Sequence, residues 1–395
     1  MNFIFISPSF PKTYYQFPKS AKEIGIKTLG IGEDNYESLS TNLKNSLDDY
    51  YKVNSLENYE EVHKAVAFFT FKYVKIDFLE SNNEYWLQLD ARLRTDFNIT
   101  SGAKLDELDG FKLKSQMKAF YKKAGVKVAR YHMVDTIENA KKFILEVGYP
   151  VVVKPDNGVG ANATYKISNE LELENFYKQG VRIPYIMEEY LEGIICSYDG
   201  IVNSKSEILF ETAHEYGDSI MDIVNDVKDS VYYSLKEIPE ELQTIGRKVI
   251  ESFKPRSRFF HTEYFILSKD KPGLASKGEI IGLEVNMRPP GGYSTDMINF
   301  ANDVDVYKMY ADMIKYDKTF HTTTRPYMVV FVGRRKTNSY KYSTEDVLKK
   351  YKDNICMSEI MPEVLATAMG NQMFIAKFKE QSESKSFLKY VLEKK

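Results

Sequence analysis

The sequence predicts a mixed α/β fold, with α+β character in its later parts, and three patterns predict it. Residues 1–105 alternate short apolar strands with helices, which is typical of a parallel sheet. A helix over 137–147 is followed at once by a β-branched strand at 151–153. Two further strands, 259–267 and 280–286, are joined by a Lys- and Gly-rich connection, and we expect them to pair antiparallel.

Length and charge narrow the class of protein. The chain has 395 residues, enough for two to three domains with sizeable cores. Its 54 basic and 56 acidic side chains give a net charge of −2, so we expect no nucleic acid and no membrane surface as partner.

Cysteine content and the N-terminus bear on the compartment. Cys196 and Cys356 cannot make a disulfide framework, which favours a reducing environment. Residues 1–8 carry no basic segment and are typical of a first strand, not of a signal peptide. Because no apolar run reaches the roughly 18 residues that span a bilayer, we expect a cytoplasmic protein.

The most informative stretch is Glu284-Val-Asn286-Met-Arg288, at the end of a short apolar strand. Side chains alternate faces along a strand, so Glu284, Asn286 and Arg288 point the same way, about 6–7 Å apart. Oxygen ligands of this kind suit Mg²⁺ beside the phosphates of a nucleotide, and the guanidinium could neutralise a phosphoryl or carboxylate group. The alternative is a strand end with a solvated polar face.

A second carboxylate is predicted beside the first. Antiparallel pairing of the two strands brings Glu263 onto the face of Glu284, and two carboxylates with an amide suit a phosphate-bridging metal site. His261 shares that strand face and is expected next to the metal ligands.

A lysine and a glycine-rich loop follow the strand at 151–153. Lys154 and the segment 158–164 could surround phosphates with backbone N–H groups and one point charge, although no Walker P-loop is present. The lysines of the preceding helix, 114–125, are expected on a solvated face. Residues 184–193 read as a strand that turns at a glycine, either structural or carrying an adenine on exposed backbone.

In this order the elements resemble the ATP-grasp superfamily of carboxylate–amine ligases, which includes D-alanine–D-alanine ligases, L-amino-acid ligases and biotin carboxylases. The shared order is a Lys that opens a helix ending in Ala-Gly, a strand Lys before a Gly-rich loop, Glu-Glu-Tyr-Leu-x-Gly, a Glu on a strand, and Glu-x-Asn-x-Arg. The resemblance implies an ATP-grasp fold with a Rossmann-like α/β domain at its N-terminus and a nucleotide held between two α+β subdomains. The implied units are an N-terminal domain at 1–105, a lid subdomain at 106–187, a central subdomain with the metal site at 188–320 and a C-terminal subdomain at 321–395.

The resemblance further implies ATP and Mg²⁺ as cofactors, with Mn²⁺ as a possible substitute. The implied metal ligands are Glu263, Glu284 and Asn286. The implied ATP contacts are Lys114, Lys154, Gly158, Gly160, Ala161, Asn162, Glu188, Glu189, Leu191 and Glu192. The segment 161–163, Ala-Asn-Ala, departs from the Ser and Gly that are frequent in the family's lid, so fewer lid contacts to phosphate are expected.

Catalytic roles are implied for three residues. Arg288 would steady the transferring phosphoryl group, and Gly291 and Gly292 would offer N–H groups to the carboxylate being activated. A second departure lies at Ile195, where the family often has an acid that binds ribose, and Glu192 could substitute for it.

The expected activity is an ATP-dependent ligase that forms an acyl phosphate from a carboxylate, an amino acid in the first place, and passes it to an amine. The alternatives are a biotin-carboxylase-like enzyme that needs bicarbonate and a non-catalytic nucleotide-binding protein. Small molecules are the expected partners, and the family suggests a homodimer. The candidate substrate contacts are Glu80, Asn82, Arg92 and His214, for which a helix cap, surface charges and a structural histidine are the alternative readings.

Overall fold

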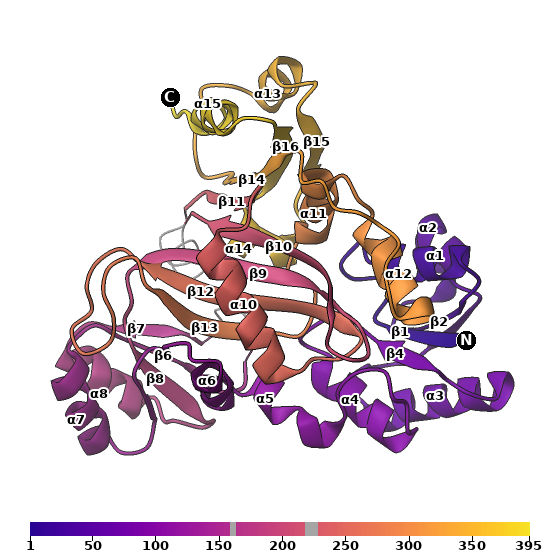
Figure 1. The fold of residues 1–395 in the computed structure, drawn as a ribbon, viewed down its shortest axis with the longest axis horizontal. Helices are drawn as coiled ribbons and strands as arrows, with labels where there is room; N and C mark the ends of the chain where they lie inside the picture. The colour runs from indigo at the N-terminus through magenta and orange to yellow at the C-terminus, as the bar shows by residue number, and fades with distance from the viewer. Residues whose placement is uncertain (159–162, 218–227) are drawn as a thin grey trace.

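The computed structural model describes residues 1–158, 163–217 and 228–395 of the chain. Within these ranges the strands form two four-stranded sheets and one eight-stranded sheet. Figure 1 shows the N-terminal domain at one end, the small sheet with its two helices at the other, and the eight-stranded sheet between and above them.

The N-terminal domain is built on a parallel sheet of order β3-β2-β1-β4, as the sequence predicts. Its elements are β1 (Asn2–Ile6), α1 (Gln16–Glu23), β2 (Lys27–Gly32), α2 (Thr41–Ser46), β3 (Asp49–Lys52), α3 (Tyr59–Tyr73), β4 (Phe78–Glu80) and α4 (Leu87–Asp96). Side chains of β1 alternate between two cores: Phe3 and Phe5 pack towards α1, whereas Ile4 and Ile6 pack towards α3. The loop after β4 therefore leaves the carboxyl edge of this sheet, where it can reach a neighbouring domain.

The second four-stranded sheet is antiparallel, with the order β5-β8-β6-β7. Its elements are β5 (Tyr131–Met133), α7 (Ile137–Val147), β6 (Val151–Pro155), β7 (Tyr165–Ile167), α8 (Glu170–Lys178) and β8 (Tyr185–Glu189). Val151, Val153 and Met187 pack against the two helices. Since side chains alternate, Lys154 and Glu188 point to the opposite face, away from the helices.

The eight-stranded sheet has the order β13-β12-β9-β10-β11-β14-β16-β15, and all its pairs are antiparallel. Its strands are β9 (Gly193–Val202), β10 (Ile208–Tyr216), β11 (Ser230–Ser234), β12 (Arg258–Leu267), β13 (Ile280–Asn286), β14 (Met328–Arg334), β15 (Ile355–Ile360) and β16 (Gln372–Phe378). The sheet continues across the predicted boundary at 320/321, and β8 continues past the one at 187/188. The strands β10 and β11 were not predicted from the sequence.

Two helices cover one face of the large sheet. The remaining α-helices of the described residues are α5 (Asp109–Lys112), α6 (Lys114–Lys123), α10 (Glu240–Phe253), α11 (Ser294–Asn302), α12 (Val306–Tyr316), α13 (Thr344–Lys350), α14 (Glu363–Met369) and α15 (Gln381–Leu392). Apolar side chains of α6 and α10 form one core with Tyr198 and Tyr264 of the sheet. A Cβ atom on Gly246 of α10 would lie 2.2 Å from the Tyr198 ring, so a glycine permits this close approach.

The N-terminal domain is attached to the opposite face of the sheet. Phe17 of α1 packs on Tyr307 and Tyr310 of α12 and on Phe259 of β12, with ring centroids 4.8, 5.3 and 5.8 Å apart. A buried carboxylate, Glu80, adds ion pairs to two arginines on either side of this junction, described below.

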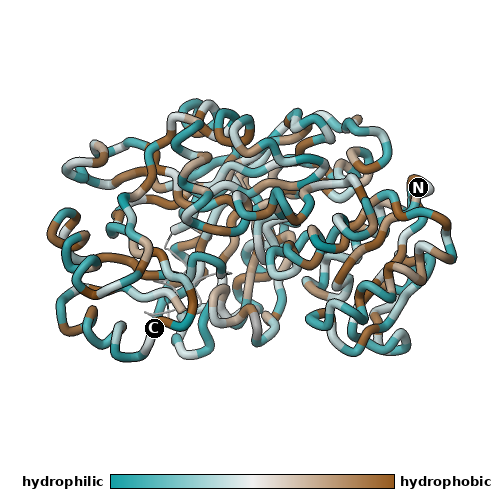
Figure 2. Tube along the Cα trace, turned by 90° about the horizontal axis from the view of Figure 1, so that it is seen from below, coloured by the Kyte–Doolittle hydropathy of each residue, from teal (hydrophilic) through white to brown (hydrophobic). Residues whose placement is uncertain are grey.

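Hydropathy varies over a few residues along the trace, and apolar and polar positions alternate instead of gathering in one long segment (Figure 2). In the described part of the chain, no helix combines the length and apolar character that crossing a membrane requires.

Candidate active site

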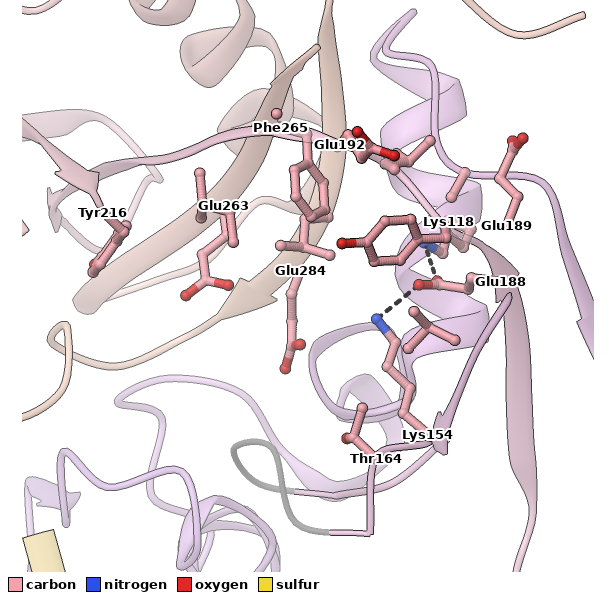
Figure 3. Close-up of a pocket in the computed structure, with 18 of the residues that line it drawn as sticks. Lys118, Lys154, Thr164, Glu188, Glu189, Glu192, Tyr216, Glu263, Phe265 and Glu284 are labelled. Atoms are coloured by element: carbon pink, nitrogen blue, oxygen red, sulfur yellow. Dashed lines mark ion pairs between the residues drawn. The ribbon is translucent and has the colours of Figure 1, made fainter. Parts of the chain in front are cut away.

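A cavity of about 360 Å³ lies between the four-stranded sheet of β5–β8 and the eight-stranded sheet (Figure 3). One wall comes from β6 and β8 and carries lysines, and the other comes from β12 and β13 and carries carboxylates. The lining residues are Glu84, Lys118, Ala129, Val152, Lys154, Thr164, Glu188, Glu189, Tyr190, Leu191, Glu192, Gly193, Ile195, Tyr216, Gly217, Glu263, Phe265, Gly282, Leu283, Glu284, Asn286 and Arg288.

Two lysines share one carboxylate on the first wall. Lys154 Nζ lies 2.8 Å from Glu188 Oε2, and Lys118 of α6 forms an ion pair with the other oxygen of Glu188. All three side chains are buried. Burial opposes ionisation of Glu188, but the two ammonium groups outweigh it and lower its pKa to about 2. The cluster carries one net positive charge, which faces the cavity.

Lys118 corrects the expectation of a solvated helix face. It lies one turn after Lys114, so both lysines project from the same side of α6, and that side is buried. The spacing of four residues was a signal in the sequence, but which face of the helix would be covered depended on the packing of another element.

Lys114 stands between the glycine-rich loop and the second wall. Its Nζ donates to the backbone oxygen of Gly158 at 3.0 Å and lies 3.5 Å from Glu284 Oε1. Asp156 anchors the loop to the start of α6, because its carboxylate accepts from the Ser115 N–H and hydroxyl at 2.7 and 2.8 Å. Three of the predicted ATP contacts, Gly160, Ala161 and Asn162, lie outside the described residues.

The segment after β8 forms the end of the cavity. The Glu189 carboxylate is fully buried and accepts from Arg130 at 2.7 and 3.1 Å, while its N–H donates to the Arg130 oxygen. Leu191 lines the cavity, and within the described part of the chain its backbone N–H has no hydrogen-bond acceptor. Glu192 is paired with Lys269 at 2.7 Å and is half exposed.

On the second wall the predicted antiparallel pairing of β12 and β13 is confirmed. Glu263 lies directly opposite Glu284 across the β12–β13 pair, and both line the cavity. Burial, together with Glu84 and Glu263, raises the pKa of Glu284 although Lys114 opposes this. Among the described residues, no three carboxylate, histidine or thiol side chains form a complete metal cage. The predicted role of Glu263, Glu284 and Asn286 as metal ligands stays a prediction.

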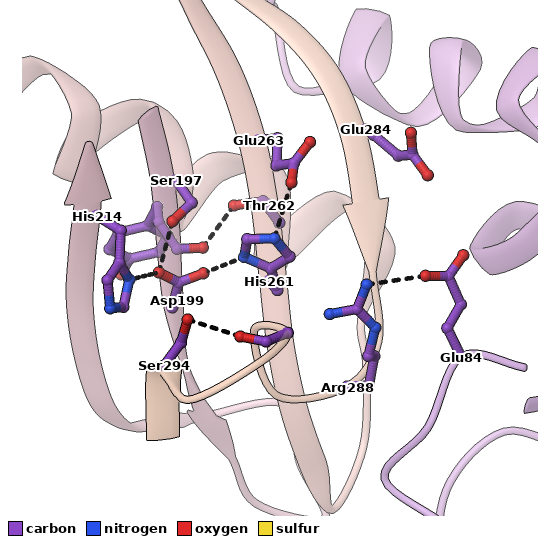
Figure 4. A network of polar contacts seen from close by, with 12 residues as sticks. Glu84, Ser197, Asp199, His214, His261, Thr262, Glu263, Glu284, Arg288 and Ser294 are labelled. Carbon is purple, nitrogen blue, oxygen red and sulfur yellow. Dashed lines mark hydrogen bonds and ion pairs between the residues drawn. The ribbon is translucent and has the colours of Figure 1, made fainter. Parts of the chain in front are cut away.

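The N-terminal domain contributes one carboxylate to this wall. Glu84, on the loop after β4, accepts from Arg288 Nη2 at 2.9 Å, as Figure 4 shows. With its amide nitrogen turned towards Glu84, Asn286 donates to the two carboxylate oxygens at 3.1 and 2.7 Å. The sequence points to the segment 80–84 as a pocket wall, with Glu80 and Asn82 as candidate substrate contacts, and the residue of this segment that lines the cavity is Glu84.

The four predicted substrate contacts lie outside the cavity lining. Glu80 is buried between Arg94 and Arg258, at 3.3 and 2.8 Å, where it joins the N-terminal domain to β12. Asn82 is buried in the same region. Arg92 is exposed and stacks on the Tyr59 ring, 3.4 Å from its centroid. His214 is fully buried against Asp199. A role of these residues in substrate binding stays a prediction.

Gly291 and Gly292 form the turn that leads into α11. The Gly291 oxygen accepts from the Ser294 hydroxyl at 2.8 Å. Gly292 has φ +65°, and a Cβ there would lie 2.4 Å from the Met369 side chain. Packing against α14 thus explains this glycine, and the predicted catalytic role of both glycines stays untested.

Comparison with known proteins agrees with this geometry. Residues 112–222 match the model of the phosphoribosylglycinamide synthetase ATP-grasp (A) domain. An L-amino acid ligase from Bacillus licheniformis superposes with a TM-score of 0.73 at 14% identity, covering 98% of this chain and 95% of that one. The chain has the ATP-grasp fold.

Two other proteins are similar to this chain, one in structure and one in sequence. The biotin carboxylase of Campylobacter jejuni superposes with a TM-score of 0.66 at 15% identity, over 98% of this chain and 90% of that one. The large chain of carbamoyl phosphate synthase from Sulfurisphaera tokodaii is 25% identical over 215 residues, which are 47% of this chain and 20% of that protein. The match thus covers a fifth of the length of that curated relative.

Proposed function

We propose that this ATP-grasp protein is an ATP- and Mg²⁺-dependent ligase that joins a carboxylate to an amine. The observation that carries the proposal is a cavity with walls of opposite charge. Lys118 and Lys154 line one side, and Glu263 and Glu284 face them from the other. A polyphosphate with a bound divalent cation is the ligand that complements both walls.

The hydrogen-bond donors of the cavity are suited to a bound nucleotide. The lysine cluster offers charge to phosphate oxygens, and Lys114 donates to the backbone oxygen of Gly158. The backbone N–H of Leu191, which has no acceptor within the described residues, can donate to a ring nitrogen of a base. Phe265 and Ile195 supply apolar surface beside it.

The oxygen atoms on the second wall are suited to Mg²⁺. This cation is usually bound by one or two carboxylates together with phosphates and water, so an open site is what it requires. Glu263, Glu284 and the oxygen of Asn286 would hold it. Crowding of buried carboxylates at this wall favours a cation, because a positive charge there offsets their repulsion.

The residues around the cavity support a reaction by charge stabilisation. Bound ATP would supply the phosphoryl group that converts a carboxylate into an acyl phosphate. Lys154 and Arg288 are placed on opposite sides to neutralise charge that spreads during the transfer. The amine then forms the C–N bond as the C–O bond to phosphate breaks, and the enclosed cavity limits attack by water.

An amino acid is the proposed carboxylate substrate. Arg288 and Glu84 present a cation and an anion side by side at the end of the cavity nearest the metal ligands. This arrangement complements the carboxylate and ammonium groups of one zwitterion.

The test is ADP release from ATP and Mg²⁺ across a matrix of paired amino acids and amines, with and without bicarbonate. We expect turnover that requires a particular pair and ignores bicarbonate. The Glu284→Ala variant should lose turnover, whereas Glu279→Ala should keep it, because Glu279 is paired with Lys127 on the surface at 2.7 Å.

Two outcomes would overturn the ligase. Turnover that follows bicarbonate would indicate a biotin-carboxylase-like enzyme. Nucleotide binding with no ADP formation for any pair would indicate a non-catalytic nucleotide-binding protein.

A further inference from the structure

A row of polar side chains crosses the face of the large sheet that is turned away from α10 (Figure 4). Its members come from β13, β12, β9 and β10, and their order follows the order of these strands. The row comprises Glu284, Asn286, Glu263, His261, Ser197, Asp199 and His214. The opposite face carries Tyr198 and Tyr264 in an apolar core, so this polar row is confined to one side.

Asp199 is the centre of the row. Its Oδ1 lies 2.5 Å from His261 Nδ1, and its Oδ2 lies 2.6 Å from His214 Nδ1. The Ser197 hydroxyl donates to Oδ2 at 2.7 Å. Asp199 is fully buried, so its charge is retained only because these donors surround it.

His261 connects Asp199 to the metal wall. While Nδ1 faces Asp199, Nε2 faces Glu263 Oε1 at 2.9 Å. The two ring nitrogens of His261 thus each contact a carboxylate oxygen, and the ring is held between Asp199 and Glu263. The ring is 3% exposed and pairs across the sheet with Asp199, which leaves it a single orientation.

The contact reaches only one oxygen of Glu263. Oε1 is bound by His261, and the carboxylate lines the cavity opposite Glu284.

We propose that His261, oriented by Asp199, is a positioning residue that fixes the carboxylate of Glu263 for the divalent cation. The proposal rests on the proposed function, since it needs a cation between Glu263 and Glu284. Outer partners of metal ligands typically change metal affinity by about 10–100-fold when removed. Within the described residues, His214 contacts the same aspartate but not Glu263. It is also buried, so it supplies a matched control.

The experiment measures Mn²⁺ affinity by electron paramagnetic resonance on the full chain saturated with ADP, beside nucleotide affinity without metal. In His261→Asn the amide reaches Asp199 but not Glu263, and we expect Mn²⁺ affinity to fall about 10–100-fold with nucleotide affinity unchanged. His261→Gln places its amide nitrogen near the Nε2 position and should recover most of the loss. His214→Asn should leave Mn²⁺ affinity within about twofold, whereas a merely structural role of the row would affect both histidine positions alike.

Equal Mn²⁺ affinity in His261→Asn and the unmodified protein would overturn the proposal, and so would equal losses in His261→Asn and His214→Asn. If His261→Asn does not fold, Asp199→Asn answers the question, because it leaves His261 in place and removes the charge that orients it. A several-fold loss of Mn²⁺ affinity is then expected, and no loss overturns the proposal. Absence of Mn²⁺ binding in the unmodified protein, with Glu284→Ala behaving identically, would instead contradict the proposed function itself.

Discussion

Glu84 accepts a hydrogen bond from Arg288 at 2.9 Å although 204 residues separate the two in the chain. The first residue lies on a loop of the N-terminal domain and the second at the exit of β13. Because the same carboxylate binds the amide of Asn286, the N-terminal domain completes the wall that carries the metal ligands. The cavity therefore depends on the docking of two domains.

Replacing Glu84 with Ala should reduce kcat/KM for the carboxylate substrate at least tenfold. Its carboxylate holds both Arg288 and Asn286, and truncating one partner of a buried charge pair leaves the other uncompensated. The KM for ATP should change far less, because the lysine wall is untouched. Steady-state kinetics with the best substrate pair would check this, with the exposed Glu60→Ala as control, and an equal loss in both variants would contradict it.

Removing the negative charge of Glu188, which two buried lysines share, should destabilise the folded protein. Glu188→Gln leaves Lys118 and Lys154 with no full negative partner in a buried position, and we expect the free energy of unfolding to fall by about 3 kcal/mol. Urea denaturation measures this. The control is Glu170→Gln, which removes an exposed partner of Lys141 at 2.6 Å and should change the free energy of unfolding far less. Similar losses in the two variants would refute the argument.

Stability should depend on pH through Asp296. Burial raises the pKa of this carboxyl from 3.8 to about 6. The folded protein then binds the proton more tightly than the unfolded chain, so the contribution of Asp296 to stability is present below pH 4 and is lost as the pH rises to 6. At about 1.4 kcal/mol per pKa unit the loss is roughly 3 kcal/mol.

The Asp296→Asn variant removes this dependence. Relative to the unmodified protein, its free energy of unfolding should rise between pH 4 and pH 7 by up to about 3 kcal/mol. The exposed Asp303→Asn variant, followed by denaturation at the same two pH values, should show no such change. A constant difference between Asp296→Asn and the unmodified protein would rule the effect out.

Gly282 should tolerate no side chain. A Cβ at this position of β13 would lie 2.4 Å from the ring of Tyr121, whose hydroxyl donates to the backbone oxygens of Glu284 and Glu263 at 2.8 and 3.2 Å. Gly282→Ala is expected to lower the free energy of unfolding by about 1–3 kcal/mol and to weaken metal binding, because Tyr121 must move. At Gly291 the nearest atom is 3.9 Å away, so Gly291→Ala should be nearly neutral in thermal unfolding.

Local sequence patterns determine several strands and helix ends of this protein. The alternation of apolar residues predicted β6, β12 and β13, and the expected antiparallel pairing of the last two placed Glu263 on the same face as Glu284. The glycine stops placed the ends of α6 and α7. These features depend on residues close together in the chain, whose geometry the backbone itself constrains.

Which faces of the helices and strands contact one another depends on the tertiary structure. Nothing local to α6 shows that the side carrying Lys118 is the one that Glu188 covers, or that the loop after β4 brings Glu84 to Arg288 while Glu80 is held by Arg258. Periodicity orients a side chain relative to its own helix or strand, but its partner on another element depends on how whole sheets dock. The chain's sequence thus determined the chemical groups of the site and their spacing along each strand, and only the packing of the domains determined which opposite charges share the cavity.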